Sequence, residues 1–238
     1  MSHHIVQAQN VDFTYPDGTP GLAGVSFRIT HGESVALVGA NGAGKSTLLM
    51  HLNGCLLPGA GTVRIGDLPV TKKTAPAIRR TVGMVFQNSD DQLFMPTVYE
   101  DVAFGPMNLG LTAEQVRPVV EQALGRVACG HLADRPPYKL SVGEKRRVAI
   151  AAVLAMSPDI LVMDEPSSSL DPRTRRELID LLKTFEHTKI IATHDLDLAL
   201  QLCPRTLVLG GGKIVADGPT GEIFADEGLL SRSRLEQP

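Results

Sequence analysis

The sequence predicts an α/β fold with a mixed core sheet, an antiparallel β subdomain and a helical insert. Three observations predict it. Four apolar runs are typical of parallel strands that are covered on both faces: SVALVGA (34–40), VGMVF (82–86), ILVMD (160–164) and KIIAT (189–193). Apolar and polar residues alternate at 25–30 and 61–66, as in half-exposed strands. Between 88 and 140, proline, glycine and helix-start signals replace the strands.

The remaining elements follow in chain order. Helices are expected at 45–53 and 173–186, and capping boxes at Thr97–Glu100 and Thr112–Gln115 start helices in the insert. The stretch 206–218 is predicted to form a hairpin around Gly210–Gly212. We therefore expect a single domain, with a core and β subdomain at 1–87 and 141–218, a helical subdomain at 88–140 and a short tail at 219–238.

Composition narrows the function. The chain has 238 residues and a net charge of -3. Because nucleic-acid-binding domains usually carry a basic surplus, no nucleic acid partner is expected. The N-terminus lacks a signal peptide, and the longest strongly apolar run (148–156) is too short to span a bilayer. Cys55, Cys129 and Cys203 fit no zinc or disulfide pattern, and the seven histidines form no metal site.

A phosphate-binding loop follows the first apolar run. GANGAGKST fills every position of G-x-x-x-x-G-K-[ST] between a predicted strand and a predicted helix. Its backbone N–H groups can surround a phosphate, Lys45 can reach the β and γ oxygens, and Ser46 can bind Mg²⁺. The expected nucleotide-binding residues are Gly39, Ala40, Asn41, Gly42, Ala43, Gly44, Lys45, Ser46 and Thr47.

Polar residues also end the other predicted core strands. Asp164 can hold Mg²⁺ and Glu165 can polarise an attacking water. His194 ends another strand, and Gln87 follows a fourth, where it can bind Mg²⁺ or hold water. In open α/β sheets this edge binds ligands, so these residues are candidates for catalysis. Tyr15 could either stack on a base or belong to the core.

The stretch LSVGEKRR (140–147) opens a helix with an unusual first turn. Ser141 and Glu144 form a capping box, but Gly143 is a poor helix former. A helix N-terminus presents unpaired N–H groups and suits a phosphate. The stretch is therefore either an ordinary helix start or an anion-binding site.

These motifs, in this order, resemble those of the ATP-binding cassette (ABC) ATPases over nearly the whole chain. The resemblance implies an ATP- and Mg²⁺-dependent ATPase of the P-loop NTPase class, in which Tyr15 stacks on adenine and Asp171 belongs to the D-loop, SSLD. It also implies that Ser141, Gly143 and Glu144, within the signature, face the γ-phosphate held by a second ATPase subunit, expected to be an identical copy. Val142 and Glu144 depart from the usual LSGGQ.

A narrower resemblance lies in VFQNSDDQLFMPTVYEDVAFGPMNLGL (85–111), which is similar to the ATPases of energy-coupling-factor importers, especially the nickel and cobalt branch. The short tail also favours that branch. It implies a peripheral protein on the cytoplasmic face of the cell membrane, with a transmembrane coupling subunit and a membrane substrate-binding subunit as partners. The alternatives are the ATPase of a vitamin importer or other transporter, a soluble ABC protein acting on DNA or ribosomes, and a P-loop kinase.

Overall fold

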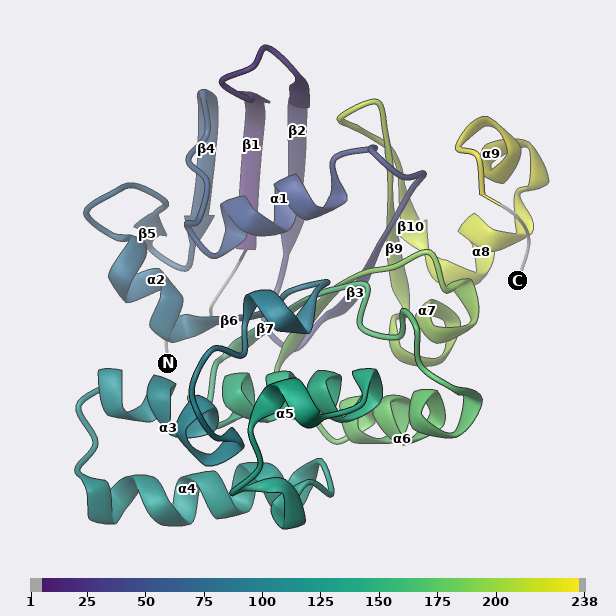
Figure 1. Ribbon diagram of the computed structural model, residues 1–238. Helices are drawn as coiled ribbons and strands as arrows, with labels where there is room; N and C mark the ends of the chain where they lie inside the picture. Colours follow the sequence, from purple (N-terminus) through teal and green to yellow (C-terminus); the bar gives the residue numbers. More distant parts are fainter. Residues whose placement is uncertain (1–5, 236–238) are drawn as a thin grey trace.

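The computed structural model describes residues 6–235, and a six-stranded sheet runs through its centre (Figure 1). The strand order is β10-β9-β3-β8-β7-β6. Strands β9, β3, β8, β7 and β6 are parallel to one another, and β10 is antiparallel to β9, so the core sheet is mixed as predicted. Their bounds are Ser34–Val38 (β3), Val82–Val85 (β6), Ile160–Asp164 (β7), Thr188–Ala192 (β8), Arg205–Gly210 (β9) and Lys213–Pro219 (β10).

The central strands are apolar along their length because both faces of the sheet are covered. In β7, Leu161 and Met163 belong to one core cluster, whereas Ile160 and Val162 belong to a second cluster. Successive side chains of a strand point to opposite faces, so each cluster takes every second residue. All four side chains are fully buried. The interpretation of the continuous apolar runs as buried parallel strands is confirmed.

A second, antiparallel sheet lies above the first in Figure 1, in the order β2-β1-β4-β5. Its strands are Val6–Thr14 (β1), Pro20–Ile29 (β2), Ala60–Ile65 (β4) and Leu68–Pro69 (β5). Helix α1 (Lys45–Leu52) joins the two sheets, because its Leu48, Leu49 and Leu52 share a core cluster with residues of both. The start of α1 is therefore held at the boundary between the sheets.

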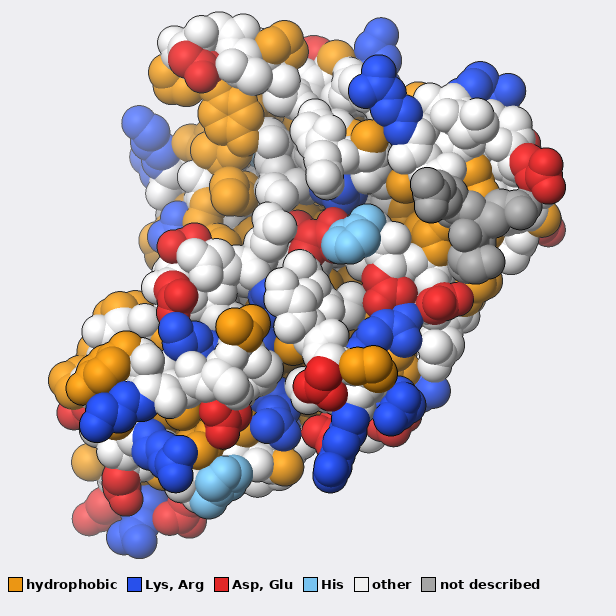
Figure 2. Space-filling view, turned by 45° about the vertical axis from the view of Figure 1, so that its right-hand side comes forward, with side chains coloured by type: hydrophobic (Ala, Val, Ile, Leu, Met, Phe, Trp, Pro, Cys, Tyr) orange, Lys and Arg blue, Asp and Glu red, His pale blue; other side chains and the backbone are white. Residues whose placement is uncertain are grey.

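A layer of helices covers the face of the central sheet that is turned away from the antiparallel sheet, at the bottom of Figure 1. It consists of α3 (Val98–Asn108), α4 (Ala113–Arg126), α5 (Val142–Leu154) and α6 (Pro172–Lys183). Exposed apolar side chains gather at the lower left of Figure 2, over this helical part of the molecule. The other helices are α2 (Ala75–Thr81), α7 (Leu196–Leu202), α8 (Thr220–Ala225) and α9 (Glu227–Arg232), and short 3₁₀ turns span Ser89–Asp91, Gly130–Leu132 and Pro137–Lys139.

Most predicted elements lie where the sequence places them, although α2, α7 and the helices of the tail were not predicted. The Thr97 capping box is complete, and the Gln115 side chain accepts a hydrogen bond from Thr112 N at 2.9 Å. Helices α8 and α9 occupy a tail for which no helix was predicted. Within 6–235, no helix is long and apolar enough to cross a membrane. The predicted division into subdomains stays a prediction, and the N-terminal residues 1–5 and the last three residues lie outside the described part.

Candidate functional site

The loop between β3 and α1 requires glycine at two positions. Gly44 has a φ of 103°, and a Cβ there would lie 2.6 Å from the carbonyl oxygen of Gly21. At Gly39, a Cβ would lie 2.2 Å from the carbonyl oxygen of Leu209. Any side chain would therefore push the loop away from its neighbours. The loop closes tightly and delivers the N-terminus of α1, a favourable place for a phosphate group.

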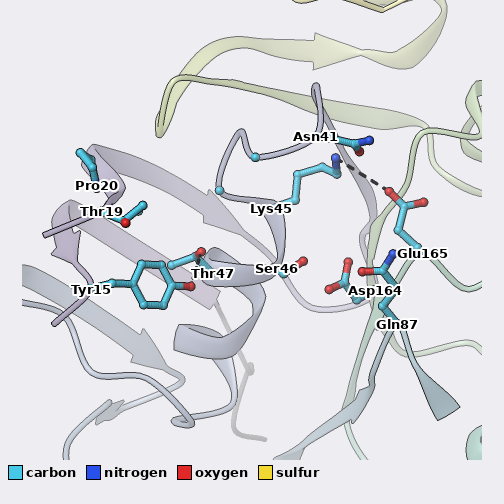
Figure 3. A pocket seen from close by; sticks show the side chains of 13 residues that line it. Tyr15, Thr19, Pro20, Asn41, Lys45, Ser46, Thr47, Gln87, Asp164 and Glu165 are labelled. Atoms are coloured by element: carbon cyan, nitrogen blue, oxygen red, sulfur yellow. Dashed lines mark hydrogen bonds and ion pairs between the residues drawn. The ribbon is translucent and has the colours of Figure 1, made fainter. Parts of the chain in front are cut away.

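Lys45 is folded back over this loop. Its Nζ donates to the carbonyl oxygens of Gly39 at 2.7 Å and Ala40 at 3.3 Å. The same Nζ lies 3.8 Å from Glu165 Oε1, an ion pair drawn as a dashed line in Figure 3. Both side chains are only 7% exposed. The ammonium group is thus held at the position where it can reach a phosphate.

The loop borders a cavity of about 450 Å³, large enough for a small-molecule ligand. Ten predicted site residues line it together with Thr19, Pro20 and Gly21, which the sequence analysis missed. The predicted ones are Tyr15, Asn41, Gly42, Gly44, Lys45, Ser46, Thr47, Gln87, Asp164 and Glu165. They come from segments far apart in the sequence.

Oxygen ligands suitable for Mg²⁺ meet in this cavity. Asp164 is 4% exposed, yet its Oδ1 has no hydrogen-bond partner. Burial raises the pKa of Asp164, and a hydrogen bond with the Ser46 hydroxyl opposes that rise. Figure 3 shows Ser46 and Asp164 side by side, with Gln87 nearby. A buried oxygen without a partner, a hydroxyl and an amide fit Mg²⁺, which is usually completed by water and substrate phosphates.

Glu165 and His194 form a second contact at the same edge of the sheet. Glu165 follows β7 with a φ of 47°, a conformation that is costly for this residue type and concentrates at functional sites. Its Oε2 accepts hydrogen bonds from His194 N at 3.1 Å and from Nδ1 at 2.7 Å when Nδ1 carries the proton. The glutamate is buried, whereas the His194 side chain is 62% exposed. Oε1 of Glu165 remains turned toward Lys45.

Tyr15 lies at the opposite end of the cavity (Figure 3). Its hydroxyl is 2.8 Å from Thr47 Oγ1, and its ring packs edge-on against Phe13 at 4.9 Å between centroids. The side chain is half-buried, so it is neither a core residue nor a free one. Stacking of Tyr15 on a base stays a prediction.

The signature residues do not line this cavity. Ser141 caps α5, and Glu144 turns back to accept from Ser141 N at 2.8 Å and from its hydroxyl at 2.8 Å. These hydrogen bonds lower the pKa of Glu144. A Cβ on Gly143 would meet only ordinary contacts, the nearest at 3.4 Å, so nothing in the described part of this chain requires glycine there. Asp171 likewise caps α6.

Two polar contacts near the site, one of a buried arginine and one of a half-buried ion pair, were not indicated by any sequence motif. Arg146 lies in the first turns of α5 and donates to the backbone carbonyl oxygens of Phe86 and Gln87. Arg175 forms a two-pronged ion pair with Asp195, 2.6 Å at each oxygen, and Ser167 donates to the same carboxylate. The run of basic residues in EKRR (144–147) is the one sequence feature that could have indicated the Arg146 contact.

The tail also approaches the site. A cavity of about 320 Å³ lies on the other side of the phosphate loop, and Arg234 and Leu235 contribute to its wall. Glu165 and His194 line the same cavity. The end of the described chain therefore lies beside Glu165 and His194, a position that no sequence motif indicated.

Comparisons with known proteins show which family this chain is similar to. A family model described as ABC transporter matches residues 22–168. A Geobacter sulfurreducens protein named "Putative ABC transporter ATP-binding protein" is 62% identical over the whole chain and 96% of its own length. An energy-coupling factor transporter ATP-binding protein, EcfA, of Methanothermobacter thermautotrophicus is 46% identical over 98% of this chain and 77% of its own length.

A solved structure shares the fold. The structure of cbiO1 from Clostridium perfringens, described as part of the ABC transporter complex cbiONQ, superposes with a TM-score of 0.83. It is 38% identical and covers 97% of this chain and 94% of its own. The agreement extends over both sheets and the helical layer.

Proposed function

Since this chain belongs to the ABC transporter family as an ATP-hydrolysing subunit, we propose that it drives an energy-coupling-factor importer of cobalt or nickel ions. It would act as a homodimer on the cytoplasmic face of the cell membrane. Its partners would be a transmembrane coupling subunit and a membrane substrate-binding subunit. The similarity to EcfA and to cbiO1 supports the importer type, and the sequence resemblance at 85–111 supports the metal substrate.

The chemistry follows from the cavity. The phosphate loop and Lys45 bind the phosphates of ATP, and Tyr15 lies where the base would stack. Ser46, Asp164 and Gln87 would hold Mg²⁺, which neutralises charge on the phosphates when bound. Glu165 orients the attacking water and accepts its proton. His194 holds Oε2 of Glu165 at 2.7 Å and so fixes the direction of the carboxylate.

A second copy completes the site. Ser141, Gly143 and Asp171 do not line the ATP cavity of their own chain. The start of α5 nevertheless has the dipole and N–H groups that favour an anion. We infer that it faces the γ-phosphate bound to the other copy, so that ATP joins the two subunits.

An exposed apolar surface is the main structural support for docking to a transmembrane subunit. Phe94, Phe104 and Met107 form an exposed apolar cluster, with side chains 63%, 42% and 59% exposed. The two rings pack edge to face at 5.0 Å between centroids. Asp101 accepts hydrogen bonds from Phe94 N and Met95 N, so the segment that presents Phe94 is fixed in place. Exposed apolar groups of this kind mark interfaces.

The docking role can be tested with Phe94→Asp. Placing a charge in the cluster should leave folding and ATP binding unchanged, because Phe94 does not line the ATP cavity, but it should abolish co-purification with the transmembrane subunit. Leu68→Asp is the control, since Leu68 is 40% exposed in β5, far along the chain from the cluster. Normal co-purification of Phe94→Asp would contradict the proposal.

The substrate can be tested in vesicles that carry the assembled importer. Uptake of labelled Co²⁺ or Ni²⁺ should depend on ATP and stop in Glu165→Gln, whereas a labelled vitamin should not enter. Vitamin uptake without metal uptake would refute the metal assignment and leave the ATPase role intact.

A further inference from the structure

The residues after β6 are held by α5 and not by the sheet. Strand β6 lies at the edge of the central sheet and ends at Val85. Beyond it, Arg146 Nη1 donates to Phe86 O at 2.7 Å, and Nη2 donates to Gln87 O. Phe86 N donates to the Gln92 side chain at 3.2 Å. Side chains therefore replace the ladder bonds that this segment has lost.

The attachment extends along the first half of α5. The Gln92 side chain also donates to Ala149 O at 2.8 Å. Lys145 forms an ion pair of 2.6 Å with Asp90, although Asp90 is largely exposed, so this contact contributes little. Arg146 is different, because it is 4% exposed. Breaking hydrogen bonds to a buried charged group is costly.

The other strand-end residues of the site are fixed by the sheet itself. Glu165 N donates to Ala192 O at 2.8 Å, and Thr193 N donates to Leu37 O at 3.1 Å. These bonds join neighbouring strands. The backbone carbonyl of Gln87 instead accepts a hydrogen bond from Arg146, a residue of helix α5 (Val142–Leu154). Gln87 and Asp164 thus line one cavity but are attached to different elements.

We propose that Arg146 is a positioning residue that ties Gln87 to helix α5, so that Gln87 moves with the signature helix relative to Asp164. The inference rests on the proposed role of Gln87 at Mg²⁺. A shift of α5, produced by the second subunit at its N-terminus, then changes the metal site of the same chain. Arginine suits this task because its rigid planar fork presents separate N–H groups to the two carbonyl oxygens in a fixed geometry, whereas lysine carries all its donors on one rotatable ammonium group.

Hydrogen–deuterium exchange of the nucleotide-free protein tests the attachment directly. In Arg146→Met, amides of 86–92 should exchange at least about tenfold faster than in wild type, because two hydrogen bonds to a charged group are lost. Arg146→Lys should give an intermediate rate and keeps the protein folded if the methionine variant unfolds. Arg147→Met is the matched control, since Arg147 lies next in α5 but pairs with Glu177 at 3.5 Å.

Unchanged exchange at 86–92 in both Arg146 variants, or equally fast exchange in Arg147→Met, would overturn the proposal. A second measurement is the Mg²⁺ concentration that half-saturates ATP hydrolysis. It should rise about tenfold in Arg146→Lys, with KM for ATP unchanged, as for residues that orient a metal ligand. If Gln87→Ala alters Mg²⁺ dependence but Arg146→Lys does not, Arg146 has no positioning role. If Gln87→Ala has no effect, the proposed metal role of Gln87 fails, while the exchange result still tests the attachment.

Discussion

Replacing Glu165 by glutamine changes one atom at the centre of the proposed mechanism. Oε2 of Glu165 accepts two hydrogen bonds from His194, and a glutamine oxygen can accept both. The amide NH₂ would then point toward Lys45, where Oε1 now lies at 3.8 Å. This group donates and cannot accept a proton. The variant therefore keeps the contact with His194 and loses only the base that faces the cavity.

The expected magnitude follows from these roles. A positioned general base contributes roughly 10²- to 10⁴-fold to a rate, so turnover should fall by about 10²-fold or more, equal to about 2.7 kcal/mol in the barrier. ATP affinity should not fall. Loss of the buried charge beside Lys45 removes a competitor for the ammonium group, which keeps its hydrogen bonds to Gly39 and Ala40 and can still reach phosphate.

The assay is ATP hydrolysis by the assembled transporter, with nucleotide binding measured in parallel. Glu177→Gln serves as the control, because Glu177 lies on α6, pairs with Arg173 and Arg147, and is 43% exposed. It should hydrolyse ATP as the wild type does. Near wild-type turnover of Glu165→Gln would refute the assignment of the base, and a large loss of ATP binding would refute the claim that only chemistry is affected.

Two further predictions concern assembly and stability. In a Glu165→Gln background, Ser141→Arg should prevent ATP-driven dimerisation in sedimentation experiments but leave the ATP affinity of the monomer nearly unchanged, since the lost helix cap costs only about 1 kcal/mol. A dimer that still forms would show that residues 140–147 are an ordinary helix start. Asp101→Ala should lower stability in thermal unfolding by about 1–3 kcal/mol, because Phe94 N and Met95 N lose their acceptor, whereas Asp101→Asn should not. Burial raises the pKa of Asp101 in the folded state, so its contribution to stability is greatest at low pH and is lost as pH rises through the folded pKa. The free energy of unfolding of Asp101→Asn should therefore increase relative to wild type as pH rises. This difference should disappear toward a pH of about 4, near the pKa of an aspartate in the unfolded chain. An asparagine variant that weakens with rising pH would contradict this sign.

The sequence predicted the parts of the site that repeat a local rule. Asp164, Glu165 and His194 lie at or just after the end of an apolar run, and Lys45 follows another run by way of the phosphate loop. The carboxyl ends of parallel strands meet at one edge of a sheet. A local pattern and one topological rule were therefore enough to bring them together. The tight turn of the loop at Gly39 and Gly44 could be predicted for the same reason, since the loop motif describes a backbone path that other residues cannot follow.

The parts that depend on packing between distant segments could not be predicted. Arg146 and Phe86 are 60 positions apart, and their bond forms only because β6 ends at the sheet edge beside α5. Periodicity predicts the face of a helix on which Arg146 lies but not the carbonyl oxygens that it meets. Arg234 and Leu235 reach the cavity beside Glu165 and His194 through the fold of the tail, which carries no motif.

The capping box at α5 has a consequence for the proposed dimer. Glu144 Oε2 accepts hydrogen bonds from the backbone N–H and from the hydroxyl of Ser141, both at 2.8 Å. The carboxylate therefore places a negative charge at the start of the helix. A γ-phosphate that approaches Ser141 must compete with this carboxylate, whereas a glutamine at 144 would offer the same hydrogen bonds without the charge. Closure of the proposed dimer therefore requires Glu144 to turn away or to be balanced by a cation, and Arg135 and Arg147 already lie close enough to lower its pKa. Arg146, buried against the Phe86 and Gln87 carbonyls, cannot serve that purpose without releasing Gln87. In the proposed dimer, the charge of Glu144 and the attachment of Gln87 through Arg146 therefore both act on the first turns of α5.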